Sequence, residues 1–140
     1  MSKTSDTKEL TINDLPNEIL LEVFGYLDIE DVCFSVREVC ERWHYLSRDE
    51  TLWKNLNFVC NKNMSTLYIT HLLTELPLLQ SLQLQWRTDV DLIFHELCNS
   101  CNNIRKIDLV CCGQIKEATI KELAEHFSDL ESFSLGNVEL

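Results

Sequence analysis

The sequence predicts a mixed α/β chain in which a helical N-terminal module is followed by a short right-handed solenoid of alternating helices and strands. Two observations support this prediction. Apolar residues follow the period of an amphipathic helix between residues 15 and 56. One apolar pattern then recurs at intervals of 26, 25 and 26 residues, which is the range of solenoid repeats. The hydrophobic fraction of 45% is sufficient for a folded core.

The N-terminal half carries two apolar stripes at helical spacing. Their members are Ile19, Leu20, Val23, Phe24 and Leu27 in the first stripe, and Val32, Val36, Val39, Cys40 and Trp43 in the second. About forty residues cannot bury both stripes among themselves, because small domains bury too small a fraction of their surface. We therefore expect the surplus apolar surface to be covered by the rest of the chain or by another protein.

The same segment resembles an F-box. The resemblance rests on Leu15-Pro16-x-Glu18-Ile19-Leu20, Phe24-x-x-Leu27, Val39-Cys40-x-x-Trp43 and Leu52-Trp53-x-x-Leu56. F-boxes are three-helix modules that dock on the small Skp adaptor of cullin-RING ubiquitin ligases, so the resemblance implies such a domain over residues 11–57. It also implies a set of adaptor contacts, namely Leu15, Pro16, Ile19, Leu20, Phe24, Leu27 and Val32. The sequence leaves open which face of the first helix is internal.

The second half repeats one pattern of apolar residues. The copies are Trp53-x-x-Leu56-x-Phe58, Leu79-x-x-Leu82-x-Leu84, Ile104-x-x-Ile107-x-Leu109 and Leu130-x-x-Phe133-x-Leu135. The last two apolar residues of each copy are two apart, so both should point to one face of a short strand. Helical positions precede the last three copies at a constant offset, namely Ile69, Leu72, Leu73 and Leu76, then Phe94, Leu97, Cys98 and Cys101, then Ile120, Leu123, Ala124 and Phe127. Each unit is therefore predicted to be a helix and a strand that stack on their neighbours.

These units resemble leucine-rich repeats, and the copy that begins at Cys101 resembles the cysteine-containing subtype. The resemblance predicts about three and a half repeats over residues 53–140 without a C-terminal cap, with Val138 and Leu140 as the last apolar residues. The concave face is expected to hold the residues that alternate with the strand leucines, namely Asn55, Asn57, Ser81, Gln83, Gln85, Trp86, Lys106, Asp108, Val110, Ser132 and Ser134. The candidates for client binding among them are Gln83, Gln85, Trp86, Lys106 and Asp108. Trp86 is expected either to be exposed, as in a binding hot spot, or to pack on the turn that follows the strand.

The cysteines admit two interpretations. Cys98-x-x-Cys101 with Cys111-Cys112 has zinc-ligand spacing in its first pair. However, Cys98 and Cys101 align with core positions of the repeat helices, and a buried cysteine behaves as a small hydrophobe. We therefore expect structural thiols, with neither a metal nor a cofactor. The odd number of seven cysteines, without a secretory signal, indicates a reducing compartment, cytoplasmic or nuclear.

Composition excludes several classes of function. The net charge of −11 would repel a phosphate backbone, so no nucleic-acid partner is expected. No apolar run is long enough for a membrane span, and residues 1–10 are polar and expected to be a disordered tail. The four histidines belong to no catalytic motif and are expected to be solvated.

Three functional hypotheses remain. The first is a non-catalytic substrate receptor of a Skp–cullin–F-box ubiquitin ligase, which binds the adaptor, reaches cullin through it, and holds a client protein on the repeats. The second is an F-box module or decoy that binds the adaptor but delivers no client. The third is a zinc-dependent regulatory module that uses the cysteines.

Overall fold

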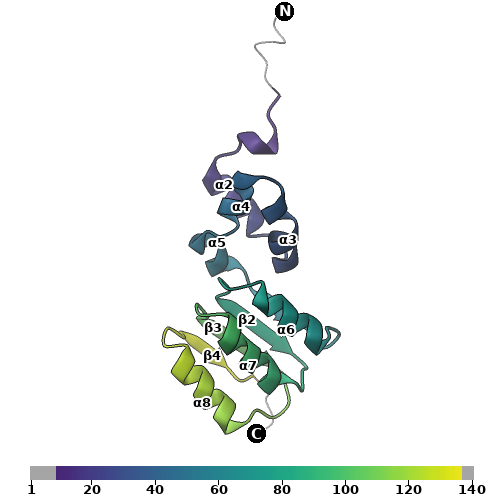
Figure 1. The fold of residues 1–140 in the computed structure, drawn as a ribbon, viewed down its shortest axis with the longest axis vertical. Helices are drawn as coiled ribbons and strands as arrows, with labels where there is room; N and C mark the ends of the chain where they lie inside the picture. The colour runs from purple at the N-terminus through teal and green to yellow at the C-terminus, as the bar shows by residue number, and fades with distance from the viewer. Residues whose placement is uncertain (1–8, 137–140) are drawn as a thin grey trace, which may run out of the picture.

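The computed structural model describes residues 9–136, so most of the predicted tail, as well as Val138 and Leu140, lies outside the described residues. Figure 1 shows a helical half placed at one end of a parallel sheet, with further helices side by side over one face of that sheet. The helical half comprises the 3-10 turn η1 (Ile12–Asp14), α2 (Asn17–Phe24), α3 (Ile29–Phe34), the 3-10 turn η2 (Val36–Glu38), α4 (Glu41–Leu46) and α5 (Glu50–Asn55). The sheet half comprises β1 (Phe58–Cys60), α6 (Thr66–Thr74), β2 (Ser81–Gln85), α7 (Val90–Ser100), β3 (Lys106–Val110), α8 (Glu117–His126) and β4 (Ser132–Ser134).

The helical half is more finely divided than the sequence predicts. Four α-helices and two 3-10 turns stand where three helices were expected within the described residues. The second apolar stripe is not one helix, because Cys40 has an extended backbone (φ −165°, ψ 172°) that separates η2 from α4. Val39 and Cys40 are exposed as a result, since positions four apart share a face only while the helix continues.

The core of the helical half is aromatic. The rings of Phe24 on α2 and Trp43 on α4 meet edge to face with centroids 4.9 Å apart, a favoured geometry for aromatic pairs. Asp49 caps α5 by accepting a hydrogen bond from the backbone N–H of Thr51 at 2.8 Å. The indole N–H of Trp53 on α5 donates to the backbone oxygen of Ser47 at 2.8 Å, which ties α5 to the end of α4.

All four strands of the sheet are parallel and follow the order β1-β2-β3-β4. Leu82 pairs with Ile107, and Ile107 pairs with Phe133, in the register that the apolar pattern predicts. Leu84 and Leu109 pair in the same way. The side chains of Leu82, Ile107 and their inward neighbours lie under α6, α7 and α8, which is why the strand leucines are buried.

The prediction for the first copy of the pattern is wrong by two residues. Phe58 pairs with Leu82, where the repeat alignment places Leu56. Only 24 residues separate Phe58 from Leu82, because α6 has 9 residues whereas α7 has 11. Side chains alternate with a period of two along a strand, so this shift keeps Phe58 and Cys60 on the buried face.

The shift also changes the residues on the other face of β1. Asn55 was expected to line the sheet but is the last residue of α5. Asn57 lies beside Ser81, whose hydroxyl donates to the Asn57 side-chain oxygen at 2.8 Å. Val59 takes the position next to Gln83.

One continuous core joins the two halves, running from Leu20 on α2 to Phe127 after α8. Two polar contacts reinforce the junction on the surface. The Tyr68 hydroxyl of α6 donates to Glu30 at 3.4 Å, and Arg37 lies 3.6 Å from Glu75.

The last helix–strand unit is the least buried. On α8 the structure confirms Leu123 as a core residue, and Phe127 after the helix is also buried. Ile120 is only half-buried and Ala124 is exposed, so the core role predicted for Ala124 is wrong. Within the described residues no strand pairs with the outer edge of β4, so α8 and β4 have a neighbouring unit on one side only. No helix in this range is long and apolar enough to cross a membrane.

A buried ion pair ties the turns at one edge of the sheet together. The Arg87 guanidinium donates to both carboxylate oxygens of Asp89, at 2.8 and 2.6 Å, and to the backbone oxygens of Asn61 and Met64, at 2.7 and 2.6 Å. The hydroxyl of Thr66 donates to the same carboxylate. Burial alone would raise the pKa of Asp89, but the hydrogen bonds from Arg87 and Thr66 outweigh it and hold the pKa below its usual value.

Replacing this carboxylate should destabilise the protein in a pH-dependent way. Asp89→Asn should lower the free energy of unfolding by about 3 kcal/mol at pH 7, because Arg87 would keep a buried charge without its counterion. The pKa of Asp89 is depressed on folding, so its contribution is complete above the unfolded pKa of about 4 and is lost as the pH falls through the folded value. Urea unfolding of both proteins at a series of pH values measures this. Asp129→Asn, an exposed carboxylate, is the matched control; a loss for Asp89→Asn that stayed the same down to pH 2 would contradict the assignment.

Candidate functional site

The predicted adaptor contacts divide between the surface and the core. Leu20, Phe24 and Val32 are buried in the chain's own core, with exposed fractions of 0%, 1% and 0%, and offer no surface to a partner in this structure. The other four members are accessible: Pro16 and Ile19 are exposed, and Leu15 and Leu27 are half-buried. The internal face of α2 is therefore the one with Leu20 and Phe24.

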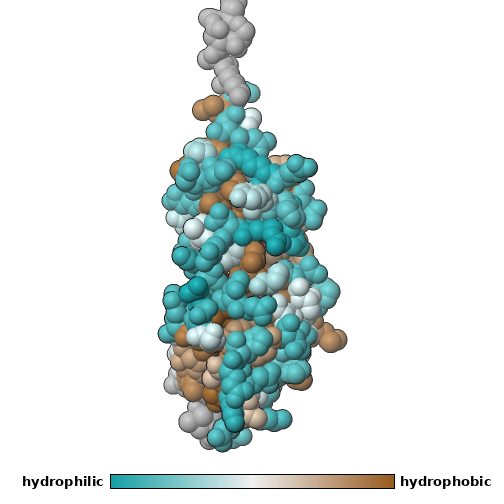
Figure 2. Space-filling model, turned by 60° about the vertical axis from the view of Figure 1, so that its left-hand side comes forward, coloured by the Kyte–Doolittle hydropathy of each residue, from teal (hydrophilic) through white to brown (hydrophobic). Residues whose placement is uncertain are grey.

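The exposed side of α2 and the segment before it form an apolar surface, which we define as Leu15, Pro16, Ile19 and Val23 and call the N-terminal apolar surface. Other exposed apolar residues of the same half are Ile12, Tyr26, Phe34, Val39 and Tyr45. Figure 2 shows hydrophobic side chains emerging among hydrophilic ones on this half. Exposed apolar groups gathered in this way are typical of a protein-binding surface.

Arg42 holds this surface in place, although the sequence gave no indication of this role. Its guanidinium on α4 donates to the Asn17 side-chain oxygen at 2.9 Å, to the backbone oxygen of Asn13 at 2.8 Å and to that of Leu15. These bonds fasten the entry into α2, whose position proline cannot secure through an N–H of its own. The signal would have been an arginine one residue before a buried tryptophan, which periodicity alone does not distinguish from a solvated residue.

The face of the sheet opposite the helices, which we call the open face, carries the predicted client-binding residues. Lys106 is exposed, and Gln83, Gln85 and Asp108 are half-buried. The Gln85 amide donates to the Gln83 oxygen at 2.7 Å, and the Gln83 amide donates to Asp108 at 2.8 Å. The structure thus connects three of the predicted residues by hydrogen bonds across β2 and β3.

Trp86 follows β2 directly and is 63% exposed, so the structure favours exposure over packing on the turn. Its backbone is left-handed (φ 55°), and so is that of Cys111 (φ 53°), which occupies the equivalent position after β3. A residue with a Cβ pays on the order of 1 kcal/mol for this conformation. The Trp86 N–H nevertheless donates to Val110 at 2.9 Å, which shows that the turn shape serves the sheet pairing.

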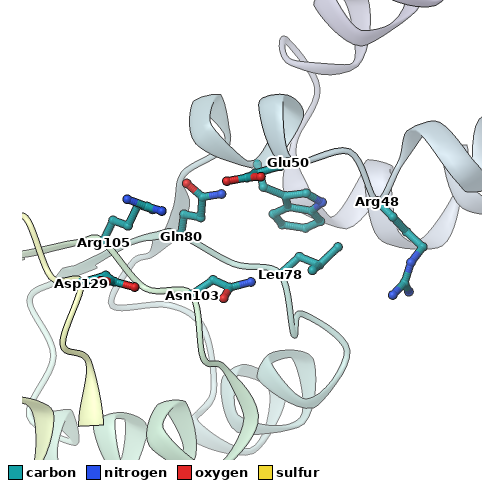
Figure 3. A pocket seen from close by; sticks show the side chains of 8 residues that line it. Arg48, Glu50, Leu78, Gln80, Asn103, Arg105 and Asp129 are labelled. Carbon is teal, nitrogen blue, oxygen red and sulfur yellow. The ribbon is translucent and has the colours of Figure 1, made fainter. Parts of the chain in front are cut away.

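A groove lies where the strands begin, next to α5. Its volume is about 290 Å³, and its lining residues are Lys54, Gln80, Ser81, Arg105, Lys106 and Glu131. We call it the cationic groove, because it has three basic residues and one acidic one. Gln80 and Arg105 also line a neighbouring pocket of about 240 Å³, in which Figure 3 shows the Gln80 amide between Glu50 and Arg105 in that view. Sequence reasoning identified only Lys106 of this set as a binding candidate.

The thiols behave as packing groups. Cys98, Cys101 and Cys112 are buried, which confirms the core positions predicted for Cys98 and Cys101. Cys101 Sγ lies 3.2 Å from the backbone oxygen of Leu76, and Cys112 Sγ lies 3.3 Å from that of Leu84. In the part of the chain that the structure describes, no group of three or more His, Cys, Asp or Glu side chains is arranged to hold a metal. All four histidines are exposed, as expected.

Comparison with known proteins identifies the first of these surfaces. Residues 12–59 match the F-box-like family, so the chain contains an F-box-like domain there. Over 47 residues, 34% of this chain, it is 45% identical to the ubiquitin ligase complex F-box protein UFO1 of Saccharomyces cerevisiae and 40% identical to F-box/LRR-repeat protein 12 of Mus musculus. Over 59 residues, 39% of the chain, it is 44% identical to F-box/LRR-repeat protein 5 of Salmo salar. The matches span 7%, 14% and 8% of the length of these three relatives and are confined to the F-box region.

The buried thiols should resist alkylation. Burial raises the pKa of Cys60, Cys98 and Cys101 to about 12 and that of Cys33 to about 11. At pH 8 a thiol of pKa 12 is ionised in about one molecule in ten thousand, and the thiolate is the reactive form. Mass spectrometry after brief iodoacetamide treatment should therefore find exposed Cys40 modified first and these four only after unfolding. Modification of Cys98 and Cys101 as fast as Cys40, in a protein that is still folded by circular dichroism, would refute this.

Proposed function

We propose that this chain is a non-catalytic substrate-recognition subunit of a Skp–cullin–F-box E3 ubiquitin ligase. The observation that carries the proposal is the F-box-like domain at residues 12–59, whose N-terminal apolar surface is accessible. In this role the domain docks on the Skp adaptor through Leu15, Pro16, Ile19 and Leu27. Through the adaptor it reaches cullin.

The second half of the chain then serves as the client-binding part. We propose that its helix–strand units form a leucine-rich-repeat solenoid of the cysteine-containing subtype, over residues 53–140. The recurrence of strand pairs 25 and 26 residues apart supports this, as do the buried Cys101 and Cys112. The client protein would contact Gln83, Gln85, Trp86, Lys106 and Asp108 on the open face. An exposed tryptophan beside a polar network is typical of a binding hot spot.

The proposed mechanism contains no chemistry by this chain, no metal and no cofactor. A shared core joins the F-box-like domain to the sheet, so a bound client is held at a set distance from the adaptor. Ubiquitin transfer gains from the raised effective concentration of client lysines at the charged conjugating enzyme. The net charge of −11 argues against a nucleic-acid partner, and the proposed site of action is the cytoplasm or nucleus, without a membrane.

A second candidate is an adaptor-binding module or decoy that delivers no client. The small extent of the open face favours it, because the four strands have only 3, 5, 5 and 3 residues. The two candidates share the adaptor contact and differ in what the sheet half does.

Adaptor binding should depend on the N-terminal apolar surface. The double variant Pro16→Ala with Ile19→Ala should weaken binding to purified Skp adaptor by at least about tenfold, since both side chains are exposed and have little role in the core. Calorimetric titration measures the affinity, and a thermal melt verifies the fold. Leu67→Ala, which truncates an 81% exposed leucine on α6, is the matched control and should bind normally. Normal binding by the double variant would remove the F-box assignment.

Client delivery distinguishes the two candidates. With the full chain expressed in cells under proteasome inhibition, a receptor should recover cullin and a set of ubiquitylated proteins. That set should shrink both with the Pro16→Ala, Ile19→Ala variant and with Trp86→Ala, although Trp86→Ala still recovers cullin. Quantitative mass spectrometry of ubiquitin remnants measures this. Recovery of cullin with a set of ubiquitylated proteins that ignores Trp86→Ala would favour the decoy.

A further inference from the structure

The cationic groove concentrates basic residues on an acidic protein. Three of the chain's 12 lysine and arginine residues line it, namely Lys54, Arg105 and Lys106, while the net charge of the chain is −11. The single acidic lining residue, Glu131, lies 3.5 Å from Arg105, and both side chains are substantially exposed. Exposed pairs of this kind contribute only about 0.2–1 kcal/mol, so Arg105 can exchange Glu131 for another anion at little cost. Within the described residues, Lys54 and Lys106 form no ion pair.

A buried amide at the base of the groove lacks a partner. Gln80 is 5% exposed, and among the described residues its side chain makes no hydrogen bond. Its backbone oxygen, by contrast, accepts from the N–H groups of Arg105 and Lys106, at 2.8 and 3.0 Å, which fixes the residue in place. A polar side chain buried to this degree usually has a hydrogen-bond partner, so a free N–H₂ donor here indicates a place for an acceptor.

We propose that the cationic groove binds an anionic side chain, a carboxylate or a phosphate, carried by an extended segment of the client protein. This inference rests on the proposed function, because it names the chemistry by which the sheet half recognises its client. Arg105 supplies the fork of N–H groups that matches either anion, and Lys54 and Lys106 supply further charge. The Gln80 amide donates the hydrogen bond that a buried acceptor requires.

The groove leads onto the open face, which restricts the rest of the segment. Ser81 and Lys106 are the first residues of β2 and β3, and Gln83 and Asp108 follow two residues later on the same face. Two residues of a strand span about 6.6 Å, the distance between alternate side chains of an extended peptide. The carboxylate of Asp108 would repel a second anion at that distance. The ligand is therefore one acidic residue followed two positions later by a neutral or basic one, which excludes a polyanion.

The test is a titration of the ¹⁵N-labelled full chain with short capped peptides, followed by NMR. The probe peptide carries one glutamate with a lysine two positions later. A second peptide has phosphoserine in place of the glutamate, a third has glutamine, and a fourth has glutamate at both positions. Inorganic phosphate alone is a separate arm.

The glutamate–lysine peptide should shift the Gln80 side-chain amide saturably, and the glutamine peptide should bind at least about tenfold more weakly. Arg105→Gln and Lys106→Gln should each weaken binding about five- to tenfold, whereas Lys121→Gln, the same charge change on exposed α8, should not. A tighter phosphoserine complex would identify phosphate as the preferred anion and also supports the proposal.

Three results would overturn it: equal binding of the glutamate and glutamine peptides, saturation by inorganic phosphate with no preference for a peptide, or equal binding of the two-glutamate peptide. The peptide comparison uses the unmodified chain, so it stands even where a groove variant does not fold. Adaptor affinity measured on the same sample separates the two claims, since loss of peptide binding leaves adaptor binding intact and the reverse also holds.

Discussion

The arrangement of the molecule depends on the pairing of β1 with β2. Strand β1 follows α5, the last helix of the F-box-like domain, after only two residues, so this pairing fixes the helical half against the sheet. Phe58 and Cys60 then lie in the same core as Leu82 and Leu84, with exposed fractions of 1% or less. A helix–strand unit buries its faces only by stacking on a neighbour, and here the F-box-like domain supplies the first neighbour. The two halves are therefore one body.

Sequence periodicity predicted the sheet best where the units are most alike. From β2 to β4 the intervals of 25 and 26 residues gave the correct pairing, because apolar residues two apart must face the same core. The prediction failed at β1, where a shorter α6 removes residues from the interval, and helix length leaves no trace in the strand pattern. It failed again at Cys40, because one extended residue interrupts the helical period without any glycine or proline to mark it.

The candidate surfaces were less predictable than the core. A stripe of apolar residues indicates burial but does not say what covers each member, which is why Leu20 and Ile19, adjacent in sequence, lie on opposite sides of α2. Arg42 and Arg87 were not found because their partners are mainly backbone oxygens and distant side chains. Such polar ties appear only once the chain has folded, whereas apolar spacing is visible beforehand.

The distribution of charge and apolar surface gives the body two ends with different chemistry. The N-terminal apolar surface offers hydrophobic contact, which depends little on salt, whereas the cationic groove attracts anions and weakens as ionic strength rises. An acidic remainder of the molecule repels anions everywhere except near Lys54, Arg105 and Lys106, so discrimination at the groove comes from repulsion elsewhere as well as attraction within. Because one core joins the two ends, salt should change what the sheet half binds while the apolar contact at the other end persists.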